Sequence, residues 1–235
     1  MIKKLFSLII INAILIGYGS AVWANNYEGV KDFLEFREKQ WPEWNLSSLK
    51  YSDIKKDLVY PSWFEGNWIV KSENLNNASE EPLYYKVRFY RNEMDEIIGD
   101  RSKNAESIGQ SVFGDRLIKV KSDPKSFNNQ IVYLKNDEYI DSRIIGRTQI
   151  SDENLFFADE LVIQKVHNNG ISRLNQVEVM SKFYRCDDLD NASGNFQRKI
   201  CGSQYLATYG SKIGEINLKS VTGNHYDLTF NFIDF

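Results

Sequence analysis

The chain has 235 residues, a formal net charge of −3 and an aromatic content of 14%. This length fits one large domain, or one domain with an extension, and is sufficient for a hydrophobic core. The mildly acidic charge excludes electrostatic attraction to nucleic acid or anionic lipid, and the many rings are typical of β architectures that pack or line a cavity with them.

The first 24 residues have the features of a Sec-type signal peptide. Two lysines precede an apolar run over residues 5–16, and the segment ends in Val22-Trp23-Ala24, with small residues where signal peptidase needs them. We therefore expect cleavage between Ala24 and Asn25 and export from the cytoplasm. Loss of the two lysines would leave a net charge of 27 − 32 = −5. An uncleaved anchor is the alternative, because residues 5–24 have roughly the length that crosses a bilayer.

A short amphipathic helix is predicted next, over residues 27–40. Its apolar residues recur at near-helical spacing among charged ones. Trp41-Pro42 ends the helix, because the residue before a proline disfavours helical backbone. An irregular lead-in then continues to residue 57. We expect it to pack over one end of the β domain that occupies residues 58–235.

After Pro61 the apolar residues alternate with polar ones, which indicates strands with one buried and one wet face. The clearest alternation lies in residues 84–90, 143–150, 175–185 and 226–232. Shorter strand candidates are residues 66–73, 115–121, 130–135, 161–167 and 204–209. These segments make an antiparallel meander of about nine strands, a pattern that closes into a barrel or folds into a sandwich to remove its edges. The predicted class is all-β, mainly antiparallel.

Cys186 and Cys201 are the two cysteines of the chain, and export would place them where disulfides persist. Their spacing is neither a redox CxxC nor a metal-binding pair. We expect a Cys186–Cys201 bond, which the entropy model values at about 3 kcal/mol for a loop of this size. Two buried free thiols are the alternative.

The segment around Gly66-Asn67-Trp68 resembles the first barrel strand of lipocalin-like (calycin) proteins. In its longer context the chain resembles an uncharacterised family of cyanobacterial and chloroplast lumenal proteins with a lipocalin-like domain. The pieces that carry the resemblance are Trp41-Pro42-Glu43-Trp44, residues 60–68, Asp115-Arg116, Asp123-Pro124, Asn129-Gln130, Gly146-Arg147 and residues 174–178. The resemblance implies an up-and-down β-barrel of eight to nine strands in the thylakoid lumen or periplasm, with no established activity. One feature departs from the lipocalin pattern. Residues 226–235 lack the arginine that stacks on the first-strand tryptophan in many lipocalins.

No motif for catalysis, a metal or a cofactor is present in the sequence. His167 and His225 are the only histidines, which leaves almost no material for a His-based triad or for a multi-histidine metal site. Nucleophile-elbow, P-loop and dinucleotide fingerprints are absent from residues 25–235. The acids at 187, 188 and 190 lack the spacing of an EF-hand loop. We therefore expect a protein that is not an enzyme and has no cofactor.

The predicted function is a monomeric carrier that holds a small apolar molecule, such as a pigment, quinone or lipid, inside the barrel. Closed barrels of about eight strands have room for one such ligand. The residues expected to line the cavity are Trp68, Val70, Tyr85, Val87, Phe89, Arg116, Ile144, Gly146, Thr148, Val177, Val179 and Phe183. For Arg116, an ion pair at the end of a strand is the alternative to a contact with the ligand. The alternative function is an interaction protein whose barrel is filled by its own rings and which docks on a membrane complex.

Overall fold

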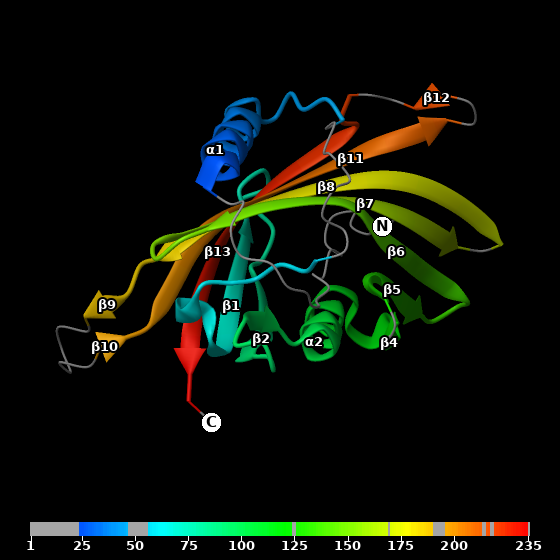
Figure 1. Cartoon of the computed structure of the whole chain (residues 1–235). Coiled ribbons are helices and arrows are strands. Elements are labelled where there is room, and N and C mark those ends of the chain that lie inside the picture. Colours follow the sequence, from blue (N-terminus) through cyan, green and yellow to red (C-terminus); the bar gives the residue numbers. More distant parts are fainter. Residues whose placement is uncertain are drawn as a thin grey trace.

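The computed structural model describes residues 24–46, 56–123, 126–168, 170–189, 196–212, 215–216 and 219–234. The expected signal peptide, residues 1–24, thus lies almost entirely outside the described residues. Within the described part of the chain, no helix has the length and apolar character needed to cross a membrane. Most of these residues are strands of one large antiparallel sheet that curls into a half-barrel (Figure 1).

The elements follow one another with few helices between the strands. They are α1 (Ala24–Lys39), the 3-10 turn η3 (Ser62–Phe64), β1 (Gly66–Asn74), β2 (Leu83–Arg91), β3 (Ile97–Gly99), α2 (Arg101–Phe113), the 3-10 turn η4 (Gly114–Arg116), β4 (Leu117–Asp123), β5 (Ser126–Leu134), β6 (Glu138–Ser151), β7 (Leu155–Asn168), β8 (Ile171–Arg185), β9 (Asp188–Leu189), β10 (Phe196–Gln197), β11 (Lys199–Lys212), β12 (Glu215–Ile216) and β13 (Thr222–Ile233).

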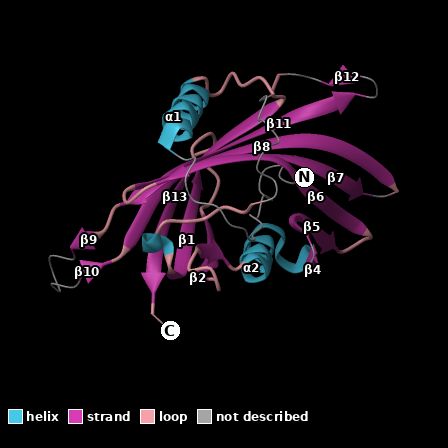
Figure 2. Ribbon diagram, in the orientation of Figure 1, coloured by secondary structure: helices cyan, strands magenta, loops and turns pink. Residues whose placement is uncertain are grey.

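The main path of the sheet runs β3-β2-β1-β13-β11-β8-β7-β6-β5-β4. The first strand β1 therefore pairs with the last strand β13, while the opening lies between β3 and β4 rather than between the chain ends. The expected barrel closed by strand pairing is thus replaced by a half-barrel. The helix α2, which the alternation of the sequence did not predict, lies on the concave side of this opening (Figure 2).

Side chains of α2 replace a strand partner along the free edge of β2. Asn104 accepts a hydrogen bond from the Arg88 N–H at 2.8 Å and donates to the Arg88 carbonyl at 3.0 Å. The Ser107 hydroxyl accepts from the Lys86 N–H at 2.9 Å. On the other side of the helix, an added Cβ at Gly109 would lie 3.3 Å from the Leu117 side chain of β4. The helix therefore satisfies one edge and packs closely on the other.

The convex face is covered by α1 and by the chain that follows it (Figure 1). Leu34 of α1 and Trp44 pack there against Phe157, Met180 and Tyr209. The concave face holds a second cluster that includes Phe156. Adjacent residues of β7 are thus buried on opposite faces, which explains why residues 156–162 are all buried rather than alternately buried and exposed.

The half-barrel is tightly packed at the start of β1, and we call this its closed end. Trp68 is 1% exposed, and its indole N–H donates to the Phe64 carbonyl at 2.7 Å. Gly66 has a φ of +130°, and a Cβ there would lie 2.4 Å from the Phe232 ring. The close approach and the positive φ both require glycine.

An arginine does stack on this tryptophan, but it comes from a different part of the chain than the last strand. The guanidinium of Arg198, between β10 and β11, lies 5.1 Å from the centre of the Trp68 ring and 4.2 Å from that of Phe232. It also donates to the carbonyls of Trp63 and Glu65, at 3.1 and 2.9 Å. Arg198 therefore ties η3 to the closed end of the sheet.

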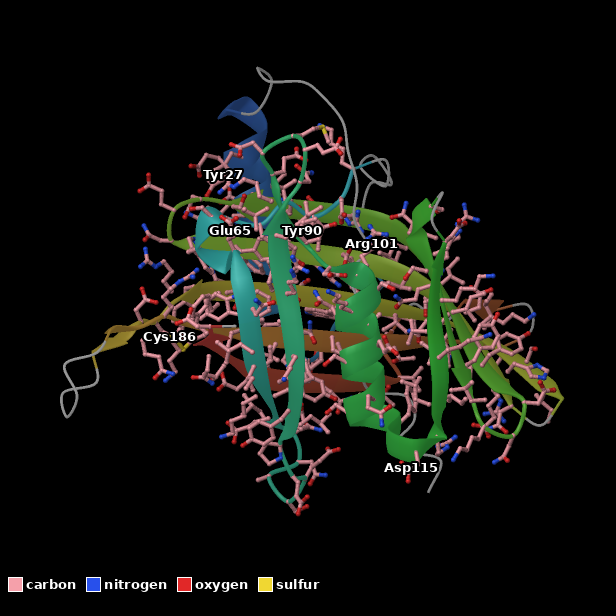
Figure 3. The ribbon with its side chains drawn as sticks, turned by 90° about the horizontal axis from the view of Figure 1, so that it is seen from below. Tyr27, Glu65, Tyr90, Arg101, Asp115 and Cys186 are labelled. Atoms are coloured by element: carbon pink, nitrogen blue, oxygen red, sulfur yellow. A yellow bond between two sulfur atoms is a disulfide. The ribbon has the colours of Figure 1, made fainter. Side chains whose placement is uncertain are left out.

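The expected disulfide is confirmed, because Cys186 and Cys201 are bonded to each other with their Cα atoms 5.8 Å apart. The bond lies at the end of β8 and the start of β11, two strands that also pair along their length. Figure 3 shows Cys186 where β8 leaves the main sheet.

Candidate functional site on the concave face

Aromatic rings fill the concave face at its closed end. The Phe64 ring, from η3, lies with its centre 4.8 Å from that of Phe89 on β2 and 5.9 Å from that of Phe230 on β13. Across the half-barrel, the centres of Phe156 and Phe183 lie 5.7 and 5.9 Å from that of Phe64. Rings from four separate strands thus meet on the one ring of Phe64 in η3, which occupies the space where an apolar ligand was expected.

A small cavity of about 90 Å³ remains between α2 and the sheet. Its polar lining comprises Ser72, Tyr85, Asn104, Ser181 and Gln204. These groups bond one another or the backbone, as in the Gln204 amide that donates to the Ser181 hydroxyl at 3.0 Å. Burial raises the pKa of the Tyr85 phenol, and a hydrogen bond with Ser72 offsets part of that rise. Tyr85 therefore stays neutral at physiological pH.

A buried cluster of two carboxylates and two guanidiniums lies farther along the same face. Arg147 on β6 lies 2.6 Å from Glu160 on β7 and 3.6 Å from Asp57 in the lead-in. Arg101, at the start of α2, lies 3.0 Å from the other oxygen of Asp57. Figure 3 shows Arg101 at this end of the helix. Each carboxylate of the cluster pairs with a guanidinium, and these ion pairs hold the lead-in and α2 on the sheet.

The ionisation of this cluster depends on burial and on its internal partners. Burial raises the pKa of Asp57, while Arg147 and Arg101 act against that rise. Burial likewise lowers the pKa of Arg101 to about 9, although Asp57 favours its charged form. Removal of either Asp57 or Arg147 would leave a buried charge without its partner, and such a change strongly destabilises the folded state.

Most of the residues predicted to line a cavity do lie on the concave face. Trp68, Val70, Val87, Phe89 and Phe183 belong to the aromatic cluster, and Tyr85 packs against it. Val177 and Val179 pack with Leu206 and Tyr226 in a neighbouring cluster. Ile144 is buried opposite Val162, in register with Val177. These residues make a packed interior, apart from the small cavity described above.

Gly146 and Thr148 lie on the opposite, convex face, contrary to prediction. The register of β6 against β7 shifts between Ile144 and Gly146, so that one extra residue stands in β6. Such a bulge turns every later side chain of the strand to the other face. Arg147 and Gln149 therefore point to the concave side, where Gln149 accepts from the Val59 N–H and donates to the Val59 carbonyl.

Arg116 does not line the interior either. It lies in η4 and forms an ion pair with Glu138 at the start of β6, with its side chain 41% exposed. The predicted strand over residues 115–121 begins instead at Leu117, so Arg116 precedes β4. The strand-end ion pair is thus its observed role.

Sequence reasoning missed the residues that fill and anchor the concave face. Phe64, Tyr60, Arg198 and Glu160 were not among the predicted site residues. The run from Tyr60 to Phe64 has three aromatic residues in five positions, and this density without alternation was the available signal. For Arg198 and Glu160 no local signal exists, because their partners lie far away in the sequence.

Among the residues that the structure describes, no group of three or more His, Cys, Asp or Glu side chains lies close enough together to hold a metal ion. The two histidines instead stack on tyrosines. The His167 ring lies 4.8 Å from that of Tyr139, and the His225 ring 4.3 Å from that of Tyr205.

Comparison with known proteins identifies one matching family. A family model described as a domain of unknown function (DUF6816) matches residues 54–231, which include the whole half-barrel except its last strand residues. No curated protein matches the chain. No solved structure matches it either.

Proposed function

Because the chain belongs to the DUF6816 family of domains of unknown function, we propose its role from geometry: an exported, non-enzymatic interaction protein whose half-barrel is filled by its own side chains. The observation that carries this proposal is the meeting of Phe89, Phe156, Phe183 and Phe230 on Phe64. The partner would be a membrane-protein complex of the thylakoid lumen or periplasm, the compartments implied by the expected signal peptide and the family resemblance.

The volume of the interior favours this role over carriage of a pigment, quinone or lipid. Pockets for such ligands have volumes of roughly 300–1,000 Å³. The cavity here has about 90 Å³, less than the engineered cavity of roughly 150 Å³ that accepts benzene. A carrier would have to displace the lead-in, and the Asp57 and Gln149 contacts hold that segment in place.

The outer face of the sheet offers a wider hollow, of about 650 Å³, over β4 to β8. Its apolar floor comes from Ile131, Ile163 and Leu174. Its charged residues are Lys121, Asp123, Asp141, Arg143 and Lys165. An apolar floor with charged surroundings is the composition expected of a protein interface with a polar rim. This hollow is therefore the surface at which we place the docking of the partner.

The Gly66, Trp68 and Arg198 arrangement supports a lipocalin-like origin of the half-barrel. A first-strand glycine and tryptophan covered by an arginine is the pattern that the resemblance implies, although here the arginine precedes β11. The opening filled by α2 would then be a modification of a closed barrel.

Purification from the native host tests the proposed function. We expect mass spectrometry to find a stoichiometric membrane-protein partner after crosslinking and no stoichiometric small molecule in an organic extract. The variant Arg143→Glu/Lys165→Glu should reduce recovery of the partner, whereas Lys39→Glu/Lys103→Glu, the same charge change on exposed helix positions, should not.

Two results would count against this role. A stoichiometric pigment, quinone or lipid in the extract would favour the carrier, and equal recovery of the partner by both variants would place docking elsewhere than the outer hollow.

A further inference from the structure

A second buried ionic site lies beneath α1, on the convex face of the sheet. Arg37 of α1 is 5% exposed, and Asp159 on β7 and Glu178 on β8 are both fully buried. Trp44 covers the site from above, with its ring 4.7 Å from the Arg37 guanidinium and its indole N–H bonded to the Arg37 carbonyl at 2.7 Å. Solvent is therefore excluded from all three charged side chains.

Glu178 has a donor on each of its oxygens. Arg37 Nη2 lies 2.5 Å from Oε1, and the Tyr209 hydroxyl lies 2.6 Å from Oε2. Both donors are therefore directed at Glu178 rather than at Asp159. Nη2 of the single guanidinium is thus bound to Glu178, while its Nε–H has no acceptor among the described residues.

Asp159, in contrast to Glu178, has no hydrogen-bond donor on its carboxyl oxygens within the described chain. Its carboxyl group lies within hydrogen-bonding reach of Glu178, and burial raises its pKa well above the usual range, with Glu178 adding to the rise and Arg37 opposing it. Two carboxyl groups therefore face one guanidinium in a site without water-exposed atoms.

The other groups near this site do not supply a second positive charge. Lys182 on β8 pairs with Glu38 of α1 at 2.7 Å, and Tyr205 on β11 bonds to the same Glu38. His225 on β13 stacks on Tyr205, and burial lowers its pKa. Glu160 follows Asp159 on the concave side of β7, where it pairs with Arg147, and Thr148 lies opposite Asp159 on β6.

We propose that Asp159 and Glu178 form a proton-binding site that couples the docking of α1 to pH. Asp159 holds one proton and donates it in a hydrogen bond to Glu178, so that the buried site is neutral overall. Loss of that proton places two negative charges beside one guanidinium, which a buried site without solvent cannot accommodate. Release of α1 from the sheet admits water to both carboxylates.

The direction of the pH effect follows from the raised pKa of Asp159. In the undocked state its carboxyl group titrates at an ordinary value of about 4. Docking is therefore most favourable at low pH and weakens as pH rises from that value towards the raised pKa. Over this window the equilibrium constant for release of α1 from the sheet should increase by about tenfold per pH unit, because one proton is released with it.

Hydrogen exchange of the α1 amides tests the proposal on the full chain. After correction for the intrinsic exchange rate, protection of residues 34–39 should fall with pH in the wild type. In Asp159→Asn, which mimics the protonated acid, protection should stay constant. Asp137→Asn, an equal charge change in the exposed turn between β5 and β6, should keep the wild-type profile.

Glu178→Gln provides an independent variant in case Asp159→Asn folds poorly. One carboxylate would then face one guanidinium, so Asp159 should ionise and the slope should again disappear. Infrared spectroscopy at neutral pH should show the carbonyl band of one protonated carboxylic acid, absent from Asp159→Asn. A wild type with no slope, variants that keep the slope, or no acid band at neutral pH would each overturn the proposal.

Discussion

At the scale of single residues, Gly202 shows how closely two neighbouring strands approach. A Cβ on this residue of β11 would lie 2.1 Å from the Lys182 carbonyl oxygen and 2.9 Å from the Phe183 Cα of β8. Gly202→Ala must therefore shift strand backbone, and we expect a loss of about 1–3 kcal/mol in the free energy of unfolding, measured with denaturant.

The matched control for this substitution is Gly29→Ala in α1. Nothing lies within 4 Å of a Cβ at that position. Alanine should stabilise the helix there by about 0.5–1 kcal/mol, because glycine loses more backbone entropy. Equal effects of the two substitutions would contradict the close strand approach at Gly202.

Trp68 is the residue on which the closed end of the half-barrel depends. Its burial, its hydrogen bond to Phe64 and the overlying Arg198 predict that Trp68→Ala lowers the free energy of unfolding by about 3–5 kcal/mol. Phe36→Ala, at a side chain that is 58% exposed, should change it by less than about 0.5 kcal/mol. A loss below about 1 kcal/mol for Trp68→Ala would mean that this end is not a packing centre.

At the scale of elements, α2 replaces the strand that would close the sheet. Its first turn is set by Asp100, whose side chain accepts from the Lys103 N–H, and its end by Gly114 with a φ of +54°. Both are ordinary helix signals. These signals were not recognised in the sequence because predicted strands flank them on both sides. Only the structure shows that the sheet opens between β3 and β4, where α2 fills the gap.

The edge-covering role of α2 predicts a local effect of Asn104→Ala. This change removes both hydrogen bonds to the Arg88 backbone, and we expect a loss of about 1–3 kcal/mol. Exchange of the Arg88 amide hydrogen should become faster. Gln110→Ala, on the exposed side of the same helix, should leave that amide unchanged. Unaltered protection in Asn104→Ala would show that the edge is covered by other groups.

At the scale of the whole molecule, the Cys186–Cys201 bond joins the residue that follows β8 to a residue near the start of β11. Replacement of both cysteines by serine should lower the free energy of unfolding by about 3 kcal/mol, because the unfolded chain gains freedom. Thiol labelling of the denatured, unreduced wild type should find no free thiol. Detection of two labelled cysteines would contradict the bond.

The features that the sequence predicted are those encoded by neighbouring residues. The alternation of residues 84–90, 175–185 and 226–232 placed β2, β8 and β13 on the correct segments. The Gly66-x-Trp68 pattern indicated a strand, which is β1, and the compartment inferred from the N-terminal segment led to the disulfide. Each of these signals depends on the chemistry of residues within a few positions of one another.

The candidate site was predicted only in part, because strand alternation assigns residues to a face only as far as the next bulge. Trp68, Val70, Tyr85, Val87, Phe89 and Phe183 were assigned to the correct face because a strand alternates regularly. Gly146 and Thr148 were assigned to the wrong face because one extra residue in β6 reverses the alternation. A bulge of this kind becomes visible only through the hydrogen bonds to the neighbouring strand.

By itself, the sequence determined that this protein is mainly antiparallel β structure with a Cys186–Cys201 disulfide. The tertiary structure alone decided that Phe64 fills the concave face, that Arg198 covers Trp68 and that Asp159 and Glu178 share a dry site under α1. These contacts join residues that are at least 19 positions apart in the sequence. No local pattern encodes such distances, because they depend on how the whole sheet curls.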